Sequence, residues 1–271
     1  MCDACVIESV KSKMISRRYL FKGAAVGAVA SALPSAVRPV LADKNSTYHD
    51  LTHTLDESFP TFSGDQQFFR EQVVNFKEHG YNLYNLKINE HIGTHMDAPI
   101  HFSEDGRTVD EIAVDDLIVP ICVIDISARA EADPNAEVTP DDLNKWISDN
   151  GDIPENACIA MYSGWENHIG TDMFRNADES GAMHFPGFHV EAASMLLENT
   201  SAKGLAVDTL SLDYGQSADF ATHYAWLPED RWGLENVANL DKLPANGATI
   251  VVGAPKFTKG TGGQCRLFAI A

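Results

Sequence analysis

The distribution of apolar residues along the chain predicts a domain that contains both strands and helices. Six short runs rich in apolar and β-branched residues predict strands, at Leu83–Ile88, Pro120–Ile126, Ala157–Tyr162, Gly204–Val207, Thr249–Gly253 and Arg266–Ala271. Strands outnumber long helices and do not alternate strictly with them, which argues against a TIM barrel and against a doubly wound sheet. We therefore expect a mixed α/β fold.

Three segments have patterns that are typical of helices. The first, Thr139–Asn150, opens with a capping threonine and a proline in the first turn, and the second is Val190–Asn199. A third, shorter helix is predicted at Leu234–Leu240. The sequence Thr261-Gly262-Gly263 predicts a turn before the last strand, because glycine pairs commonly interrupt regular structure.

Residues 1–42 have the features of an export signal. The paired arginines of Ser16-Arg17-Arg18-Tyr19-Leu20-Phe21-Lys22 precede a weakly hydrophobic Ala/Gly-rich segment, and Val40-Leu41-Ala42 offers a cleavage site. This order is typical of a twin-arginine signal, and the apolar segment is too short to span a bilayer comfortably. The alternative is an amphipathic first helix of the domain. We expect cleavage, export to the periplasm, and one mature domain at residues 43–271.

The mature chain is strongly acidic. Six of the 20 Lys and Arg residues and two of the 39 Asp and Glu residues lie in residues 1–42, which leaves 14 basic and 37 acidic residues and a net charge of −23. Such a surface repels phosphate backbones, so nucleic-acid binding is disfavoured. The remaining cysteines, Cys122, Cys158 and Cys265, are odd in number and predict no disulfide framework.

The richest cluster of chemically active residues is His91-Ile-Gly-Thr-His95-Met-Asp97-Ala-Pro-Ile-His101-Phe102. Neutral imidazole and carboxylate are the usual ligands of divalent transition metals, and the segment places three imidazoles and one carboxylate within eleven residues. Its glycine and proline do not fit a long helix, so we expect a loop or a single turn. His91, His95 and Asp97 are the predicted ligands, and His101 is suited to carry a proton. The alternative is a surface loop that binds no metal.

A second group of polar residues follows late in the chain. His223 lies in Ala221-Thr-His-Tyr-Ala-Trp-Leu, and Glu235 follows it by twelve residues. By themselves these two residues fit a structural role. The sequence contains no G-x-G-x-x-G, no G-x-x-x-x-G-K-[ST] and no G-x-S-x-G, so it gives no sign of a nucleotide cradle or of a serine-hydrolase elbow.

The segment His91–Phe102 resembles the H-x-G-T-H-x-D-x-P-x-H-F signature of the cyclase family of metal-dependent hydrolases, which includes bacterial kynurenine formamidase and isatin hydrolase. Further similarities follow the family's order: Asp50-Leu-Thr-His53, Gly164-Trp165, Asp208-Thr-Leu-Ser-Leu-Asp213, then His223 and Glu235. One difference is Leu210, where kynurenine formamidases tend to have proline. This segment is therefore more similar to the isatin-hydrolase-like and uncharacterised branches of the family.

The resemblance implies both a fold and a site. The fold would be a compact single α/β domain with a mixed, partly barrel-like sheet flanked by helices, assembled as a dimer or tetramer. His91, His95 and Asp97 would hold a first divalent metal ion, Zn or Mn. Asp97, His223 and Glu235 would hold a second ion, or shape the site if one ion binds. His101 would be the acid/base.

The implied function is hydrolysis of an amide or lactam C–N bond in a small aromatic substrate by metal-activated water. Two other classes remain open at this point: a metal-dependent lyase or dehydratase, and a periplasmic protein that only binds its ligand through the metal. Aromatic residues near the motifs could line a pocket for a planar substrate, with Trp165 and Phe102 the first candidates and Phe62, Phe174, Tyr224 and Trp226 the others.

Overall fold

The computed structural model describes residues 46–271, so the predicted export signal lies outside the described residues. Residues 46–69 and 87–271 form one compact unit, and residues 70–86 belong to another. The two are described separately below.

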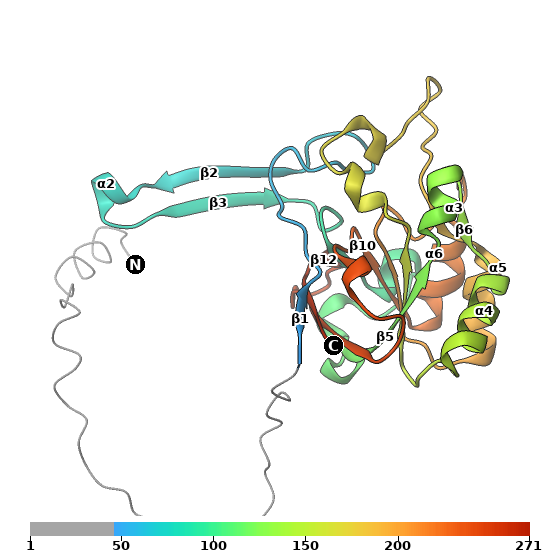
Figure 1. The fold of residues 1–271 in the computed structure, drawn as a ribbon. Helices are drawn as coiled ribbons and strands as arrows, with labels where there is room; N and C mark the ends of the chain where they lie inside the picture. Colours follow the sequence, from blue (N-terminus) through green and yellow to red (C-terminus); the bar gives the residue numbers. More distant parts are fainter. Residues whose placement is uncertain (1–45) are drawn as a thin grey trace, which may run out of the picture. The chain divides into compact units, whose positions relative to one another are not determined.

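A mixed nine-stranded sheet forms the centre of the larger unit (Figure 1). In spatial order its strands are β1 (Tyr48–Asp50), β13 (Arg266–Ile270), β11 (Ala248–Gly253), β5 (Ile118–Asp125), β7 (Cys158–Tyr162), β9 (Gly204–Val207), β10 (Trp232–Glu235), β4 (His95–Asp97) and β12 (Gly262–Gln264). Neighbours from β5 to β10 are parallel, and the other pairs are antiparallel. The sheet is strongly curled, so the expected mixed, partly barrel-like α/β fold is confirmed.

The central strands β5, β7 and β9 are mostly apolar because both faces of the sheet are covered. Side chains alternate between the two faces. Ile121, Cys158 and Ala206 pack with residues of β10, β11 and β13 in one core cluster. Cys122 and Ile159 face a second cluster, which contains Leu and Trp residues of the helices. Figure 1 shows these helices together on one side of the sheet.

The helices are α3 (Ser127–Ala132), α4 (Pro140–Asn150), α5 (Val190–Asn199) and α6 (Ala221–Trp226). Helix α4 begins as its sequence predicts, since Thr139 and Asp142 form a capping box. Short connecting elements complete this unit: β6 (Glu137–Val138), β8 (Gly187–Phe188), η2 (Pro99–Phe102), η3 (Val109–Glu111), η4 (Val114–Asp116), η5 (Trp165–His168), η6 (Asp172–Phe174), η7 (Leu227–Glu229) and η8 (Leu240–Lys242).

The six predicted strands and the first two predicted helices are present, with ends shifted by at most two residues. The prediction of a third helix at Leu234–Leu240 is wrong. Leu234 lies in β10 between β9 and β4, and Asn236 and Asn239 have positive φ angles of 55° and 57° that interrupt any helix. The predicted turn at Thr261-Gly262-Gly263 is also wrong in part, because Gly262–Gln264 pairs with β4 as strand β12. Both errors concern strands whose partners lie far away in sequence.

The smaller unit is a hairpin. Strands β2 (Phe68–Val74) and β3 (Leu83–Ile88) pair with each other, and the short helix α2 (Phe76–His79) lies between them. The Asn75 side chain accepts a hydrogen bond from the Glu78 backbone, and Gly80, with φ 81°, ends the helix. Several apolar side chains of the hairpin are exposed, among them Phe69, Val73, Phe76, Leu83 and Leu86.

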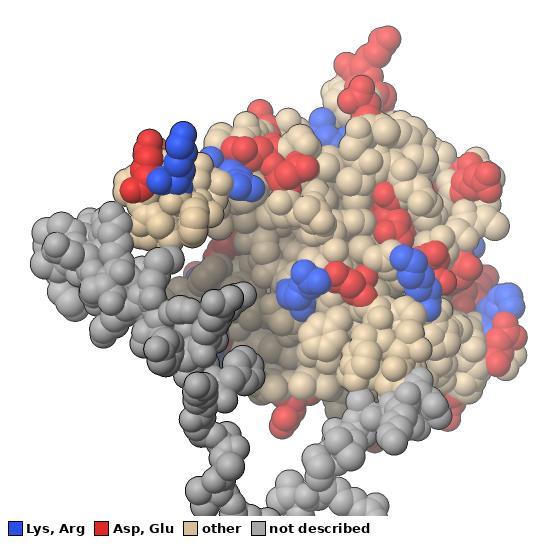
Figure 2. Space-filling model, turned by 60° about the vertical axis from the view of Figure 1, so that its left-hand side comes forward, with Lys and Arg blue, Asp and Glu red and all other residues tan. Residues whose placement is uncertain are grey.

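Acidic side chains are distributed over the visible face in Figure 2, with fewer lysines and arginines between them. This agrees with the excess of Asp and Glu in the sequence. Within residues 46–271, no helix has the length and apolar character needed to cross a membrane.

Candidate metal centre

Strand pairing and helix α6 bring four of the predicted metal ligands to one place. His95 and Asp97 are two residues apart on β4, so their side chains leave the same face of the strand. The register of β4 with β10 places Glu235 opposite His95 and Gly233 opposite Asp97. His223 reaches the same point from α6. The spacing His-x-Asp is therefore that of a strand, although the sequence predicts a loop or turn here.

The four side chains surround a single buried point. His95 Nε2 lies 3.4 Å from Asp97 Oδ1 and 3.4 Å from Glu235 Oε2. His223 Nε2 lies 3.5 Å from Asp97 Oδ2 and 3.2 Å from Glu235 Oε1. The Asp97 side chain is 1% exposed, and its Oδ2 and the Nε2 of His95 have no hydrogen-bond partner in the structure. Buried polar atoms without partners are costly, so this donor set fits a cation between them.

Neighbouring groups orient both imidazoles toward this point. The Nδ1–H of His95 donates to the carbonyl of Gly93 (2.8 Å), and the Nδ1–H of His223 donates to Asp213 (2.5 Å). Each ring therefore presents the lone pair of its Nε2, which is the arrangement that metal-binding histidines usually have. Gly233 leaves room for the carboxylate, because a Cβ at this position would lie 3.3 Å from Asp97 Oδ2 and 2.8 Å from a methyl of Leu212.

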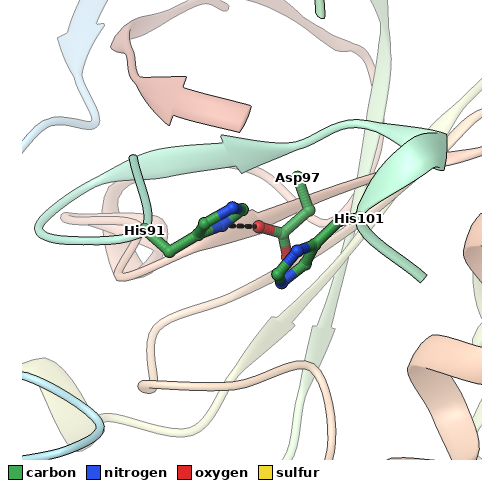
Figure 3. A group of neighbouring side chains, drawn as sticks. All are labelled: His91, Asp97 and His101. Carbon is green, nitrogen blue, oxygen red and sulfur yellow. Dashed lines mark hydrogen bonds and ion pairs between the residues drawn. The ribbon is translucent and has the colours of Figure 1, made fainter. Parts of the chain in front are cut away.

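His91 and His101 lie beside the same carboxylate (Figure 3). His91 Nδ1 is 2.7 Å from Asp97 Oδ1, and the His101 ring stacks on that of His91 with centroids 3.8 Å apart. One donor atom from each of His91, Asp97 and His101 lies within 4.8 Å of the others, as is also true of His95, Asp97 and Glu235. All six polar residues predicted from the sequence thus lie together, with His101 at the edge of the group.

The pKa values reflect the mutual charges of this cluster. Burial raises the pKa of Asp97, but the neighbouring imidazoles of His223, His91 and His95 outweigh it and hold this pKa well below its usual range. Burial lowers the pKa of His95, yet the neighbouring carboxylates of Asp97 and Glu235 raise it to about 9. Burial lowers the pKa of His101 to about 4, although the charge of Asp97 opposes the shift. His101 is therefore neutral at pH 7 and can accept a proton.

A cavity of about 340 Å³ opens onto the cluster. Phe62, Phe102, Leu210 and Phe220 supply its apolar surface, so the expectation for Phe102 agrees with its position. Phe220 and the polar Asn236 were not recognised from the sequence, although each lies within three residues of a recognised ligand.

Trp165, the other predicted pocket residue, does not line this cavity. It is 3% exposed and packs with Phe174, Phe185 and Leu210 in a separate apolar cluster. Its Nε1–H donates to the carbonyl of Phe174, and its backbone N–H donates to Asp208. Burial raises the pKa of Asp208 to about 7. Of the other aromatic candidates, Phe174 and Trp226 are fully buried and Tyr224 is 61% exposed.

Comparison with known proteins places this site in a described family. The family described as "Putative cyclase" matches residues 49–214, which is more than half of the chain. An isatin hydrolase from Roseibium aggregatum is 35% identical over 195 residues, covering 68% of this chain and 73% of that protein. A kynurenine formamidase from Bacillus anthracis is 34% identical over 85 residues, covering 31% and 41%.

Comparison of the fold with solved structures indicates the same family. The solved structure of isatin hydrolase A from Ralstonia solanacearum matches with a TM-score of 0.82 and 31% identity, over 89% of this chain and 100% of that one. The buried cluster of histidines and carboxylates, the curled mixed sheet and these similarities agree with one another. The chain therefore belongs to the cyclase family, as its motifs indicate.

Proposed function

We propose that this protein is a metal-dependent hydrolase that cleaves the C–N bond of an amide or lactam in a small, planar aromatic substrate. The observation that carries the proposal is the buried ring of His95, Asp97, His223 and Glu235 at the floor of an apolar cavity. Imidazole and carboxylate donors suit zinc or manganese. The similarity to isatin hydrolases supports the reaction class.

A divalent cation in this ring would polarise the substrate carbonyl and make water acidic enough to supply hydroxide near neutral pH. The protein itself supplies the proton carrier and the walls. Neutral His101 takes the proton from the attacking water and returns it to the departing nitrogen. Phe62, Phe102 and Phe220 contact the faces of an aromatic ring and exclude water from it.

The charge of the cavity favours a neutral substrate. Among the described residues that line it, none is lysine or arginine, and the polar lining consists of amides, hydroxyls, imidazoles and Glu235. An amino-acid substrate such as N-formylkynurenine carries a carboxylate that would find no lysine or arginine in this cavity and would compete with the scissile carbonyl for the metal ion. Isatin and related lactams are uncharged and planar, and they require no cationic side chain.

A substrate panel tests this proposal. Purified protein loaded with zinc or manganese is mixed with isatin, N-formylkynurenine, a simple lactam and a lactone, and ring opening or formate release is followed by absorbance. We expect kcat/KM for isatin to exceed that for N-formylkynurenine by roughly tenfold or more, and chelation of the metal to abolish both activities. Preferential release of formate would contradict the preference for a neutral ring, and activity that survives complete metal removal would contradict the reaction class.

Two further features are proposed for the whole chain. Arg17-Arg18 and the apolar segment after them support export to the periplasm, and the exposed Leu83 and Leu86 of the hairpin support a homodimer or tetramer. A two-stranded hairpin is marginally stable alone, and packing against another copy would stabilise it. We expect the protein in the periplasmic fraction and a dimeric or tetrameric mass by light scattering. A cytoplasmic monomer would contradict both features.

A further inference from the structure

Thr261, which lies outside the predicted metal site, contacts the edge of His91 that faces away from Asp97, and Glu90 contacts Thr261. Thr261 Oγ1 lies 2.9 Å from His91 Nε2. The same hydroxyl donates to Glu90 Oε2 at 2.6 Å, and the backbone N–H of Thr261 donates to that oxygen at 3.2 Å. Glu90, Thr261 and His91 thus form a chain of hydrogen bonds on the side of His91 opposite Asp97.

The direction of this chain follows from counting protons. A threonine hydroxyl has one hydrogen, and an ionised carboxylate only accepts, so the hydrogen of Thr261 points to Glu90. The oxygen of Thr261 must therefore accept a hydrogen bond from the Nε2–H of His91. A neutral imidazole has a single N–H, which leaves the lone pair of Nδ1 facing Asp97 Oδ1 at 2.7 Å.

This tautomer is the reverse of that of His95 and His223. His95 and His223 donate from Nδ1 and present Nε2 to the cluster, whereas His91 donates from Nε2 and presents Nδ1. Two lone pairs that face each other repel unless a cation lies where both can reach it. We propose that Glu90 and Thr261 are positioning residues, which fix His91 in its Nε2–H tautomer so that it binds the metal through Nδ1.

The backbone around Thr261 holds the hydroxyl in place. Strand β12 pairs with β4 in a register that puts Gly262 opposite Asp97, so the residue before Gly262 is fixed relative to the carboxylate. A Cβ at Gly262 would lie 2.7 Å from Cε1 of His91 and 2.3 Å from the carbonyl oxygen of Met96. A Cβ at Gly260 would lie 3.0 Å from Glu90 Oε1. The glycines on both sides of Thr261 therefore allow the close approach that the hydrogen bonds require.

Zinc affinity, measured by competition with a chromogenic chelator and without substrate, tests the proposal. Thr261→Val removes the hydroxyl at nearly constant volume, and we expect it to weaken zinc binding by about 10- to 100-fold, the usual effect of losing a group that orients a metal-binding histidine. Thr261→Ser keeps the hydroxyl and should bind zinc as the wild type does. Thr249→Val on β11 is the matched control and should also leave the affinity unchanged.

A spectroscopic signature separates positioning from a general structural effect. In the zinc-loaded protein with ¹⁵N-labelled histidine, the signals that disappear in His91→Gln should show a protonated Nε2 and a metal-bound Nδ1. If Thr261→Val does not fold, Glu90→Ala serves in its place, because it removes the carboxylate oxygen that accepts the hydroxyl hydrogen of Thr261. Wild-type affinity in the variant that folds, or a protonated Nδ1 on His91, would overturn the assignment.

The inference rests on the proposed function only in that it requires a divalent cation at this site. The proposed reaction and the positioning role of Thr261 and Glu90 can be refuted independently of each other. A wild-type protein that binds zinc but opens no lactam would contradict the proposed reaction, and the comparison of Thr261→Val with Thr261→Ser would still decide the role of the hydroxyl.

Discussion

Replacing Asp97 with alanine is expected to empty the metal site. The Asp97 carboxylate lies within 3.5 Å of nitrogens from His91, His95 and His223, so its loss removes the one group that all three imidazoles face. Metal affinity should fall by more than about 100-fold, since even the loss of an outer orienting group can reach that size. The metal content of the purified variant, determined by mass spectrometry, should be close to zero, and turnover should be lost with it.

Asp241→Ala is the matched control for this experiment, because Asp241 is exposed and lies in η8, outside the cluster. It should keep the metal content and the activity of the wild type. Circular dichroism of Asp97→Ala would show whether the variant is folded. A folded Asp97→Ala protein with full metal occupancy would exclude Asp97 as a ligand.

Replacing His101 with alanine is expected to leave the metal in place and to slow turnover by about two to four orders of magnitude, the usual contribution of general acid–base catalysis. His101 lies at the edge of the cluster, stacked on His91, and is neutral at pH 7 because burial lowers its pKa to about 4. The wild-type rate should fall as the pH drops through about 4, where His101 becomes protonated and can no longer accept a proton. Metal content and kcat are measured on the same preparation.

Measuring metal content and rate together distinguishes two roles for His101, that of a proton carrier and that of a metal ligand. One donor atom each of His91, Asp97 and His101 lies within 4.8 Å of the others, so the geometry also permits His101 to be a ligand. Loss of metal in His101→Ala would show that it is one, and a wild-type rate would show that it carries no essential proton. His49→Ala on β1 controls for the removal of a histidine elsewhere.

The first part of the site was predictable because its donors lie close together in sequence. His95 and Asp97 are separated by one residue of the same strand, so their convergence needs no long-range information. The contributions of His223 and Glu235 depend on α6 and β10, and only the resemblance to a known family indicated them. Strand register places Glu235 opposite His95 across 140 positions of sequence, and no local pattern encodes such a pairing.

The errors have the same origin. Leu234–Leu240 has the composition of a helix, but its first residues belong to strand β10, which pairs with β9 and β4. Gly262 and Gly263 indicate a turn when read locally, yet they allow β12 to pass close to His91. Trp165 was predicted to line the pocket because it is close to a motif in sequence. In the structure its two N–H groups donate hydrogen bonds to Phe174 and Asp208, which hold it outside the cavity. In each case a tertiary contact overrides the local preference.

Strand β4 has only three residues, but it is paired on both sides, with β10 and with β12. The backbone that carries His95 and Asp97 is thus fixed by the folded sheet before any ion arrives. Loading the site then requires little ordering of the chain, in contrast to small zinc domains that fold only with their metal. The apoprotein should accordingly persist as a folded species, able to release and exchange its ion without unfolding.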